Sequence, residues 1–431
     1  MNKTKGRGRG PISKGPKAAS RPTSNNTKNS TNTSCSRTDS RKPSHVKRER
    51  KEKPDILKPE DKLQFTKCKI KVKNVLGRGG FGQVYNVFLI DKPSQTGALK
   101  IEPEKTGHRL LFESLLLTHI QHSTGEKSLF PKIYDYGTTI VNNISYRYCL
   151  FQILGTNLSD LRLKYGKDGK LLEKPTCAHV SLQTFKSLWD FHELGFGHFD
   201  IKPQNFVCGR GSEEERIFLI DYGIGRYCMD NGEFICPPTK YSFAGTPKYC
   251  SLNSHRRTHP DQKDDLESWL YMMFEIFSES GLIWSGRDPV PKIQEQKQGL
   301  LKNADDVLSK VPEVFTKVAD SINTGAYGKK PPHSILYKEM EEHFTKQGWL
   351  PCQKVEWIGT QENAEHITIQ CDPLDEKALK SLKYDDWDRI AKKAMPKEAF
   401  SKVNMSLTNM KQSLKSPKND DNIEDAVRER K

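Results

Sequence analysis

The chain has 431 residues, 34% of them hydrophobic, and a formal net charge of +16. This length allows one large or two ordinary domains, and the low hydrophobic share indicates that part of the chain does not fold. No stretch approaches the about 18 apolar residues of a membrane-spanning helix, no apolar run marks a signal peptide, and the ten cysteines lack CxxC or zinc-site spacing. We therefore expect a protein with reduced thiols that resides in the cytoplasm, with the nucleus as a second location.

Residues 1–62 are basic and nearly free of aliphatic and aromatic side chains. They contain 18 Lys+Arg and 6 Asp+Glu, a balance of +12, which leaves only +4 for the other 369 residues. Such a segment cannot bury enough apolar surface to offset its chain entropy, and we expect a disordered tail. Two interpretations stay open: a solvated linker, or an arm that contacts polyanions or microtubules, in which the cluster at 47–53 could act as a nuclear-import patch.

A strand–glycine–strand pattern follows the tail. Residues 68–76 alternate apolar and polar side chains, which predicts a strand. Residues 77–82 form a GxGxxG pattern, and residues 83–90 again favour a strand. A dinucleotide fingerprint would lead from a strand into a helix. Two strands around the glycines instead predict a flexible hairpin that lies over the phosphates of ATP.

Two residues downstream of the glycines are candidates for an ion pair at this site. Lys100 lies in the strand-like segment 97–102, which makes it a candidate ligand of the α- and β-phosphates rather than an exposed strand lysine. Residues 109–117 have a helical pattern with Glu113 as their one acidic residue. Glu113 is therefore the expected partner of Lys100, and a solvated helix position is its alternative.

An apolar strand and an amphipathic helix lead to the centre of the chain. Residues 148–155 are largely apolar and end in glycine. We expect this segment to join two lobes and to offer its backbone near 152–154 to adenine. Residues 176–194 carry apolar side chains at helical spacing and stop at Gly195, which predicts a helix that delivers the chain to the next motif.

Residues 198–205 carry the pattern HxDxKPxN, which is typical of a phosphotransferase catalytic loop. Asp200 can accept the proton of an attacking hydroxyl, Lys202 can neutralise the γ-phosphoryl, and Asn205 can hold a magnesium ion. Asp221 follows 16 residues after Asn205 and opens a DYG sequence, which fits a second magnesium ligand. The spacing allows two short strands joined by a turn.

Two polar residues beyond this motif are expected to support it. Thr246 could tie the substrate platform at 243–251 to Asp200. Residues 264–277 are apolar on nearly all sides after an acidic start, which indicates a helix in the core. Asp265 at the start of this helix is expected to brace the catalytic-loop backbone. Its alternative is an N-terminal charge that only the helix dipole favours.

These motifs together resemble those of eukaryotic protein kinases, and in detail those of the casein kinase 1 superfamily and its tau-tubulin kinase-like branch. The resemblance covers about residues 63–360, and Ser251-Leu252-Asn253 stands where most other kinases have APE. The segments that carry the detailed resemblance are 111–114, 154–158, 200–206, 243–249 and 264–268.

The resemblance implies an α+β fold with two lobes, a small β-rich N-lobe at about 63–153 and a larger helical C-lobe at about 154–360. It implies ATP and Mg²⁺ as cofactors, Ser or Thr of protein substrates as acceptors, no membrane partner and a monomer. It assigns catalysis to Asp200 and Lys202, and metal binding to Asn205 and Asp221. The residues that it places around the nucleotide are Leu76, Gly77, Gly79, Gly82, Val84, Ala98, Lys100, Glu113, Phe151, Leu154, Asn205 and Asp221.

The sequence departs from the kinase pattern at two positions. Phe199 replaces the usual Arg before the catalytic Asp, so a phosphorylated activation loop loses its main partner and constitutive activity is expected. Tyr222 replaces the Phe of DFG, and its hydroxyl then needs a partner. The superfamily's preference for acidic or prephosphorylated substrates depends on a basic site. Lys248 stands at one of its positions, with Lys292 or Lys297 as the second.

Other interpretations of the chain stay open. The two departures allow a pseudokinase or scaffold that binds nucleotide or partners without phosphate transfer. The basic tail could also be the functional centre. Residues 361–431 form a C-terminal extension that we expect to be partly disordered, and within it the segment 384–390 could pack on the domain.

Overall fold

The computed structural model describes residues 54–79, 82–106, 109–125, 128–230, 233–234, 243, 245–302, 311–326, 328–363 and 365–369. The basic residues up to 53 and the segment 384–390 lie outside the described residues, so what the sequence suggests about them stays a prediction.

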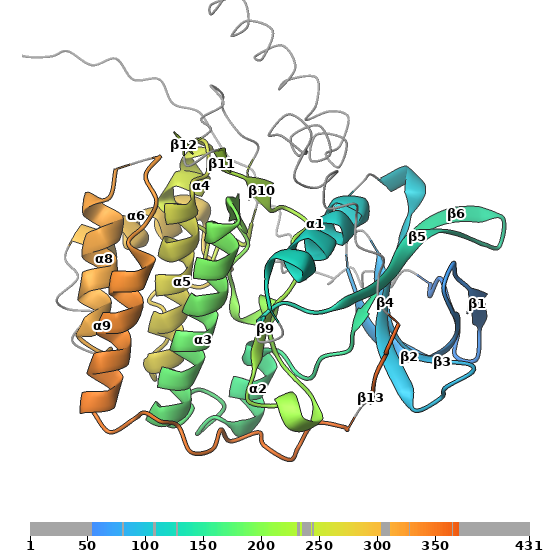
Figure 1. Ribbon diagram of the computed structural model, residues 1–431. Coiled ribbons are helices and arrows are strands. Elements are labelled where there is room, and N and C mark those ends of the chain that lie inside the picture. The colour runs from blue at the N-terminus through green and yellow to red at the C-terminus, as the bar shows by residue number, and fades with distance from the viewer. Residues whose placement is uncertain are drawn as a thin grey trace, which may run out of the picture. The chain divides into compact units, whose positions relative to one another are not determined.

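The N-lobe is built around an antiparallel sheet with the strand order β1-β2-β3-β4-β6-β5. Its strands are β1 (Lys62–Gln64), β2 (Lys69–Arg78), β3 (Gln83–Leu89), β4 (Gln95–Pro103), β5 (Ile133–Val141) and β6 (Ile144–Gln152). In β2 the buried Ile70 and Val72 alternate with lysines, as the sequence pattern predicted. The helix α1 (Arg109–Ser123) packs on β5 and β6 (Figure 1).

The C-lobe is helical, and α5 lies at its centre. Its helices are α2 (Leu158–Tyr165), α3 (Lys174–Glu193), α4 (Leu252–Arg256), α5 (Gln262–Phe277), α6 (Val290–Lys302), α8 (Val314–Thr324) and α9 (His333–Lys346). Figure 1 shows α3, α5, α8 and α9 side by side. A capping box of Asp261 and Asp264 starts α5, and Trp269 packs edge-on against Phe185 and Phe315 with ring centroids 5.0 and 5.7 Å apart. The two-lobed fold is thereby confirmed.

Short elements between the large helices carry the predicted motifs. They are η1 (Glu104–Thr106), β7 (Phe196–Gly197), η2 (Pro203–Asn205), β8 (Phe206–Cys208), η3 (Gly211–Glu213), β9 (Ile217–Leu219), β10 (Arg226–Tyr227), β11 (Met229–Asp230) and β12 (Glu233–Phe234). The antiparallel pair β8 and β9 follows the catalytic loop and leads into Asp221. The expected arrangement of two short strands and a turn is therefore present.

The folded part of the chain extends beyond the limits of 63 and 360 that the sequence suggested. Leu57 is buried in the N-lobe core, and its backbone N–H donates to the Tyr85 hydroxyl at 3.0 Å. At the other end, β13 (Glu365–His366) pairs in parallel with β4. Residues 54–62 and 361–369 therefore belong to the packed structure, because apolar side chains in both segments complete the N-lobe core.

Two expectations from composition can be compared with the described residues. The cysteines among them are free thiols. Within the same residues, no helix has the length and apolar character needed to cross a membrane.

Replacing Leu57 by alanine tests whether residues 54–62 are part of the folded unit. We expect Leu57→Ala to lower the free energy of unfolding by about 2–5 kcal/mol, because it leaves a cavity beneath the sheet. Urea denaturation measures the effect, with Ile140→Ala as the matched control because Ile140 is 72% exposed on β5. Equal unfolding midpoints for the two variants would show that the segment is dispensable for stability.

Candidate active site

A cavity of about 740 Å³ lies between the N-lobe sheet and the C-lobe. It is lined by all twelve residues that the resemblance placed around the nucleotide, and by Asp200. Lys202 is the one predicted site residue outside the lining, and it contacts Asp200 directly. Residues from strands, glycine loop, hinge and catalytic loop, which are far apart in the sequence, thus converge on one volume.

An ion pair crosses the N-lobe side of the cavity. Lys100 on β4 donates to Glu113 Oε2 on α1 at 2.6 Å, as predicted, and lies 3.5 Å from Asp221 Oδ1. Burial opposes the charged ammonium, but Glu113 and Asp221 outweigh it and raise the pKa of Lys100 above its ordinary value. The Lys100 charge in turn lowers the pKa of Asp221, although burial of Asp221 opposes this. Both groups therefore keep their charges at neutral pH.

The glycine hairpin covers the cavity and depends on close backbone approach. A Cβ atom at Gly82 would lie 2.3 Å from the Ile101 carbonyl oxygen, so a side chain there would force the hairpin away from β4. A Cβ at Gly77 would meet nothing within 4 Å. The tip residues 80 and 81 lie outside the described residues.

Apolar side chains form the inner walls of the cavity. Ala98, Val84 and Leu154 were predicted, whereas Val207 and Ile220 were not. Leu154, Val207 and Phe218 form a small buried cluster against which Ile220 packs. Sequence could have indicated both missed residues, since each lies within two positions of a predicted metal ligand.

The catalytic loop surrounds Asp200 with donors. Thr246 Oγ1 donates to Asp200 Oδ1 at 2.8 Å, which confirms the predicted link to the substrate platform. Lys202 Nζ lies 2.5 Å from Asp200 Oδ2 and 3.3 Å from Thr246 Oγ1. Asn205 Nδ2 donates to the Asp200 carbonyl oxygen at 2.8 Å, which leaves Asn205 Oδ1 available to a cation. Asp200 is thus fixed in orientation beside a lysine that can approach an anionic group.

Asp265 braces the catalytic loop from below, as expected. Its carboxylate, fully buried on α5, accepts from the backbone N–H of His198 at 2.6 Å and of Phe199 at 2.7 Å. His192 Nε2 lies 3.0 Å from the same carboxylate. Phe199 has φ +63°, a conformation that costs a bulky residue roughly 1–3 kcal/mol, and these hydrogen bonds hold it there.

Both departures from the kinase pattern are buried. The Phe199 ring lies over Gly197, where a Cβ would come within 2.2 Å of the ring. Tyr222 is fully buried, and its hydroxyl donates to the Leu219 carbonyl oxygen. Burial raises the pKa of Tyr222 well above its ordinary value, so the hydroxyl stays a donor. The partner that the Tyr222 hydroxyl needed is therefore a backbone carbonyl.

The candidate residues of the basic site differ in exposure, and Lys292 is the exposed one, paired with Asp288 at 3.0 Å. Lys248 Nζ pairs with Glu275 Oε2 at 2.8 Å, and Arg162 also pairs with Glu275, at 3.0 Å. Lys297 is fully buried and donates to the carbonyl oxygens of Pro247 and Cys250. Burial lowers the pKa of Lys297 to about 8. As placed, Lys297 supports the backbone behind Lys248 and has no open face for a substrate phosphate.

The cavity fits a nucleotide with magnesium. Within the part of the chain that the structure describes, no cluster of three or more His, Cys, Asp or Glu side chains could hold a metal. A magnesium ion bound with a nucleotide needs only one or two protein ligands besides the phosphates. Asn205 and Asp221, which both line the cavity, meet this requirement.

Comparison with known proteins yields one family match and several relatives. The model described as protein kinase domain matches residues 70–333. A Caenorhabditis elegans protein, whose name marks it as a candidate serine/threonine-protein kinase, is 33% identical over 211 residues, which are 49% of this chain and 56% of that protein. Serine/threonine-protein kinase spe-6 of the same organism is 28% identical over 357 residues, or 79% of this chain and 90% of the relative. The match thus covers little more than half the length of the first of these two Caenorhabditis elegans relatives.

The buried hydroxyl at position 222 gives a stability test. Tyr222→Phe should lower the free energy of unfolding by about 1 kcal/mol, because it removes the donor to the Leu219 carbonyl. The control is Tyr146→Phe, since the Tyr146 ring is buried in the N-lobe while the described residues give its hydroxyl no hydrogen-bond partner. Chemical denaturation of both variants at one pH measures their free energies of unfolding. A loss at Tyr146 as large as that at Tyr222 would contradict the assigned bond.

Proposed function

Because the chain belongs to the protein kinase domain family, we propose that it transfers the γ-phosphoryl of MgATP to Ser or Thr hydroxyls of proteins. The observation that carries the proposal is the convergence of Lys100, Asp200, Asn205 and Asp221 on one cavity, with Lys202 against Asp200. Magnesium, held by Asn205 and Asp221, would neutralise charge on the phosphates.

The residues of the chain would act mainly by positioning. Lys100, fixed by Glu113, would hold the α- and β-phosphates. Asp200 would accept the hydroxyl proton of the substrate, and its contacts with Thr246 and Lys202 fix its carboxylate beside the cavity. Lys202 would stabilise negative charge on the transferred group, and a lysine at this position favours Ser/Thr over Tyr substrates.

A pseudokinase is the alternative, motivated by Phe199 and Tyr222. Both side chains are buried, and neither stands at a position assigned to phosphate or metal binding. This supports catalysis over a scaffold role. Binding of MgATP in a thermal-shift assay without phosphate transfer would favour the scaffold.

At a finer level, we propose membership of the casein kinase 1 superfamily, with acidic or prephosphorylated substrates. Lys248 supports this in part, because it is positioned on the substrate platform but shares Glu275 with Arg162. The preference should therefore be modest. A peptide panel with and without a phosphoserine near the acceptor would measure it, and equal kcat/KM for both peptides would contradict it.

Asp200→Asn tests the proposed chemistry. We expect kcat to fall roughly a thousandfold or more, because the proton acceptor is lost, while nucleotide binding is retained. The matched control is Asp320→Asn, since Asp320 is exposed on α8. Radiolabelled phosphate transfer to casein measures the rate. Unchanged activity in Asp200→Asn would remove Asp200 from the mechanism.

Constitutive activity is the second expectation from this site. The buried Phe199 offers no cation to a phosphorylated activation loop. Thr239, Lys240 and Ser242 lie outside the described residues. An ion pair of a loop phosphate with a cation such as Arg226 or Lys240 would stabilise the loop by only about 1 kcal/mol if it were exposed to solvent. Protein made in bacteria should therefore be active, and phosphatase treatment or the Thr239→Ala, Ser242→Ala double variant should change its rate less than twofold. A large loss in either case would show that another basic residue receives a loop phosphate.

A further inference from the structure

The segment after α9 crosses from the C-lobe to the N-lobe. Figure 1 shows it leave α9, pass below α3 and α2, and reach β4 as β13. The family match ends at residue 333, so the described residues 355–363 and 365–369 lie beyond it. We call these residues the C-terminal strap.

Buried side chains anchor the strap at both ends. At the C-lobe, Trp357 is fully buried and donates from Nε1 to the Glu214 carbonyl oxygen at 2.8 Å. At the N-lobe, Ile367 is 4% exposed and belongs to the core of the sheet. Thr368 N–H donates to Gln95 Oε1 on β4 at 3.3 Å. The strap is therefore fixed to both lobes by packing.

Between its anchors, the strap lies against the hinge that joins the lobes. Thr156 Oγ1 donates to Gln361 Oε1 at 3.1 Å. A Cβ at Gly155 would lie 2.6 Å from the same Gln361 oxygen, so the hinge glycine makes room for the strap. Glu362 pairs with Arg210 at 3.6 Å and with Lys73 on β2 at 3.8 Å, and Arg210 Nε donates to the Leu154 carbonyl at 2.7 Å.

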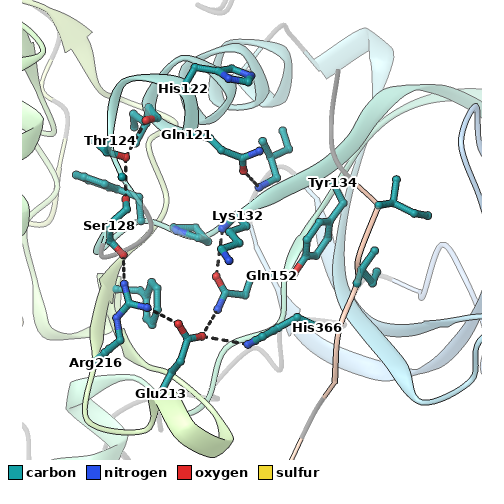
Figure 2. A pocket seen from close by; sticks show the side chains of 18 of the residues that line it. Gln121, His122, Thr124, Ser128, Lys132, Tyr134, Gln152, Glu213, Arg216 and His366 are labelled. Carbon is teal, nitrogen blue, oxygen red and sulfur yellow. Dashed lines mark hydrogen bonds and ion pairs between the residues drawn. The ribbon is translucent and has the colours of Figure 1, made fainter. Parts of the chain in front are cut away.

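A polar cluster connects the strap to the hinge side chain Gln152, as Figure 2 shows. Gln152 Nε2 donates to Glu213 Oε2 at 2.7 Å, and His366 Nε2 lies 3.0 Å from the same oxygen. Arg216 binds the other Glu213 oxygen. The cluster lines a cavity of about 1150 Å³, and Pro131 and Gln152 line both this cavity and the nucleotide cavity. One hinge residue is thus held by the C-lobe and the strap together.

The N-lobe anchor also touches the strand that lines the nucleotide cavity. A Cβ at Gly97 would come within 2.8 Å of Ile367 Cδ1, so Ile367 packs directly on β4. The next residue, Ala98, lines the nucleotide cavity, and Lys100 follows on the same strand. A shift of the strap would therefore move β4, and with it Ala98 and Lys100, relative to the hinge. Ala98 is part of the wall against which adenine would pack, which we call the adenine wall.

We propose that the C-terminal strap is a positioning element of the nucleotide site, with Ile367 as its decisive residue. The proposal rests on the proposed function, since it assigns the strap to the ATP site of that kinase. By fixing β4 against the hinge, the strap sets the distance between the adenine wall and the hinge backbone before nucleotide arrives. It contributes to nucleotide affinity and leaves the protein-substrate side of the cavity unchanged.

The test compares two neighbouring positions of the strap in the full chain. Ile367→Ala removes the N-lobe anchor, whereas Glu365→Ala changes an exposed side chain two residues away. We expect Ile367→Ala to raise the dissociation constant of MgATP about 3- to 10-fold, and Glu365→Ala to leave it within twofold. In phosphate transfer, KM for ATP should rise while kcat and KM for the peptide stay constant. An unchanged dissociation constant together with lowered stability would reduce the strap to a structural role and overturn the proposal.

A compensating pair tests the contact itself. Gly97→Ala should weaken nucleotide binding through the clash with Ile367 Cδ1, and adding Ile367→Val, which removes that atom, should restore part of the affinity. Strictly additive effects would contradict transmission through this contact. The strap is tested by the dissociation constant of MgATP, which does not depend on phosphate transfer. If the protein binds MgATP but transfers no phosphate, the proposed function is refuted, and the binding measurements still decide the role of the strap.

Discussion

The buried carboxylate of Asp265 is the constraint on which the geometry of the site depends. It accepts from two consecutive backbone N–H groups of the catalytic loop and contacts His192. Each of those N–H groups would cost about 1–3 kcal/mol if left buried without a partner. Asp265 at the capped start of α5 therefore holds the backbone conformation at Phe199. Because Asp200 is the next residue, the same hydrogen bonds help to orient its side chain.

Of the two unusual aromatic residues, Phe199 is held directly by this carboxylate, whereas Tyr222 is held by its own contacts. Once Asp265 fixes Phe199 with positive φ, the side chain is turned inward over Gly197. An arginine there would have to bring a charge into the same buried position or reach past it. Tyr222 occupies an apolar site between Phe130 and Phe191, and its hydroxyl is satisfied by backbone three residues earlier. Phe199 is thus fixed through its backbone, and Tyr222 through its ring and its hydroxyl.

Sequence alone predicted the parts of the site whose chemistry demands particular residue types at short spacing. Asp200, Lys202 and Asn205 lie within six consecutive residues, and Lys100 and Glu113 lie in one strand and the helix that follows it, so each could be predicted from its pattern. The strap could not be predicted, because its contacts join residues that are far apart in the sequence, from 143 positions between Glu214 and Trp357 to 273 positions between Gln95 and Thr368. Val207 and Ile220 were missed because ordinary aliphatic side chains carry no chemical signal of their own, and only their closeness to Asn205 and Asp221 in the sequence could have indicated them.

The strap also changes what sequence variation in this protein would mean. The family match ends at residue 333, whereas the packed core of the N-lobe includes Ile367, with Ile369 packed against it. Val355, Trp357 and Ile367 are buried from solvent like the side chains at the centre of α5, although they lie beyond the end of the family match. Tolerance to substitution should therefore be as low at these three positions as in the core, and high at their exposed neighbours.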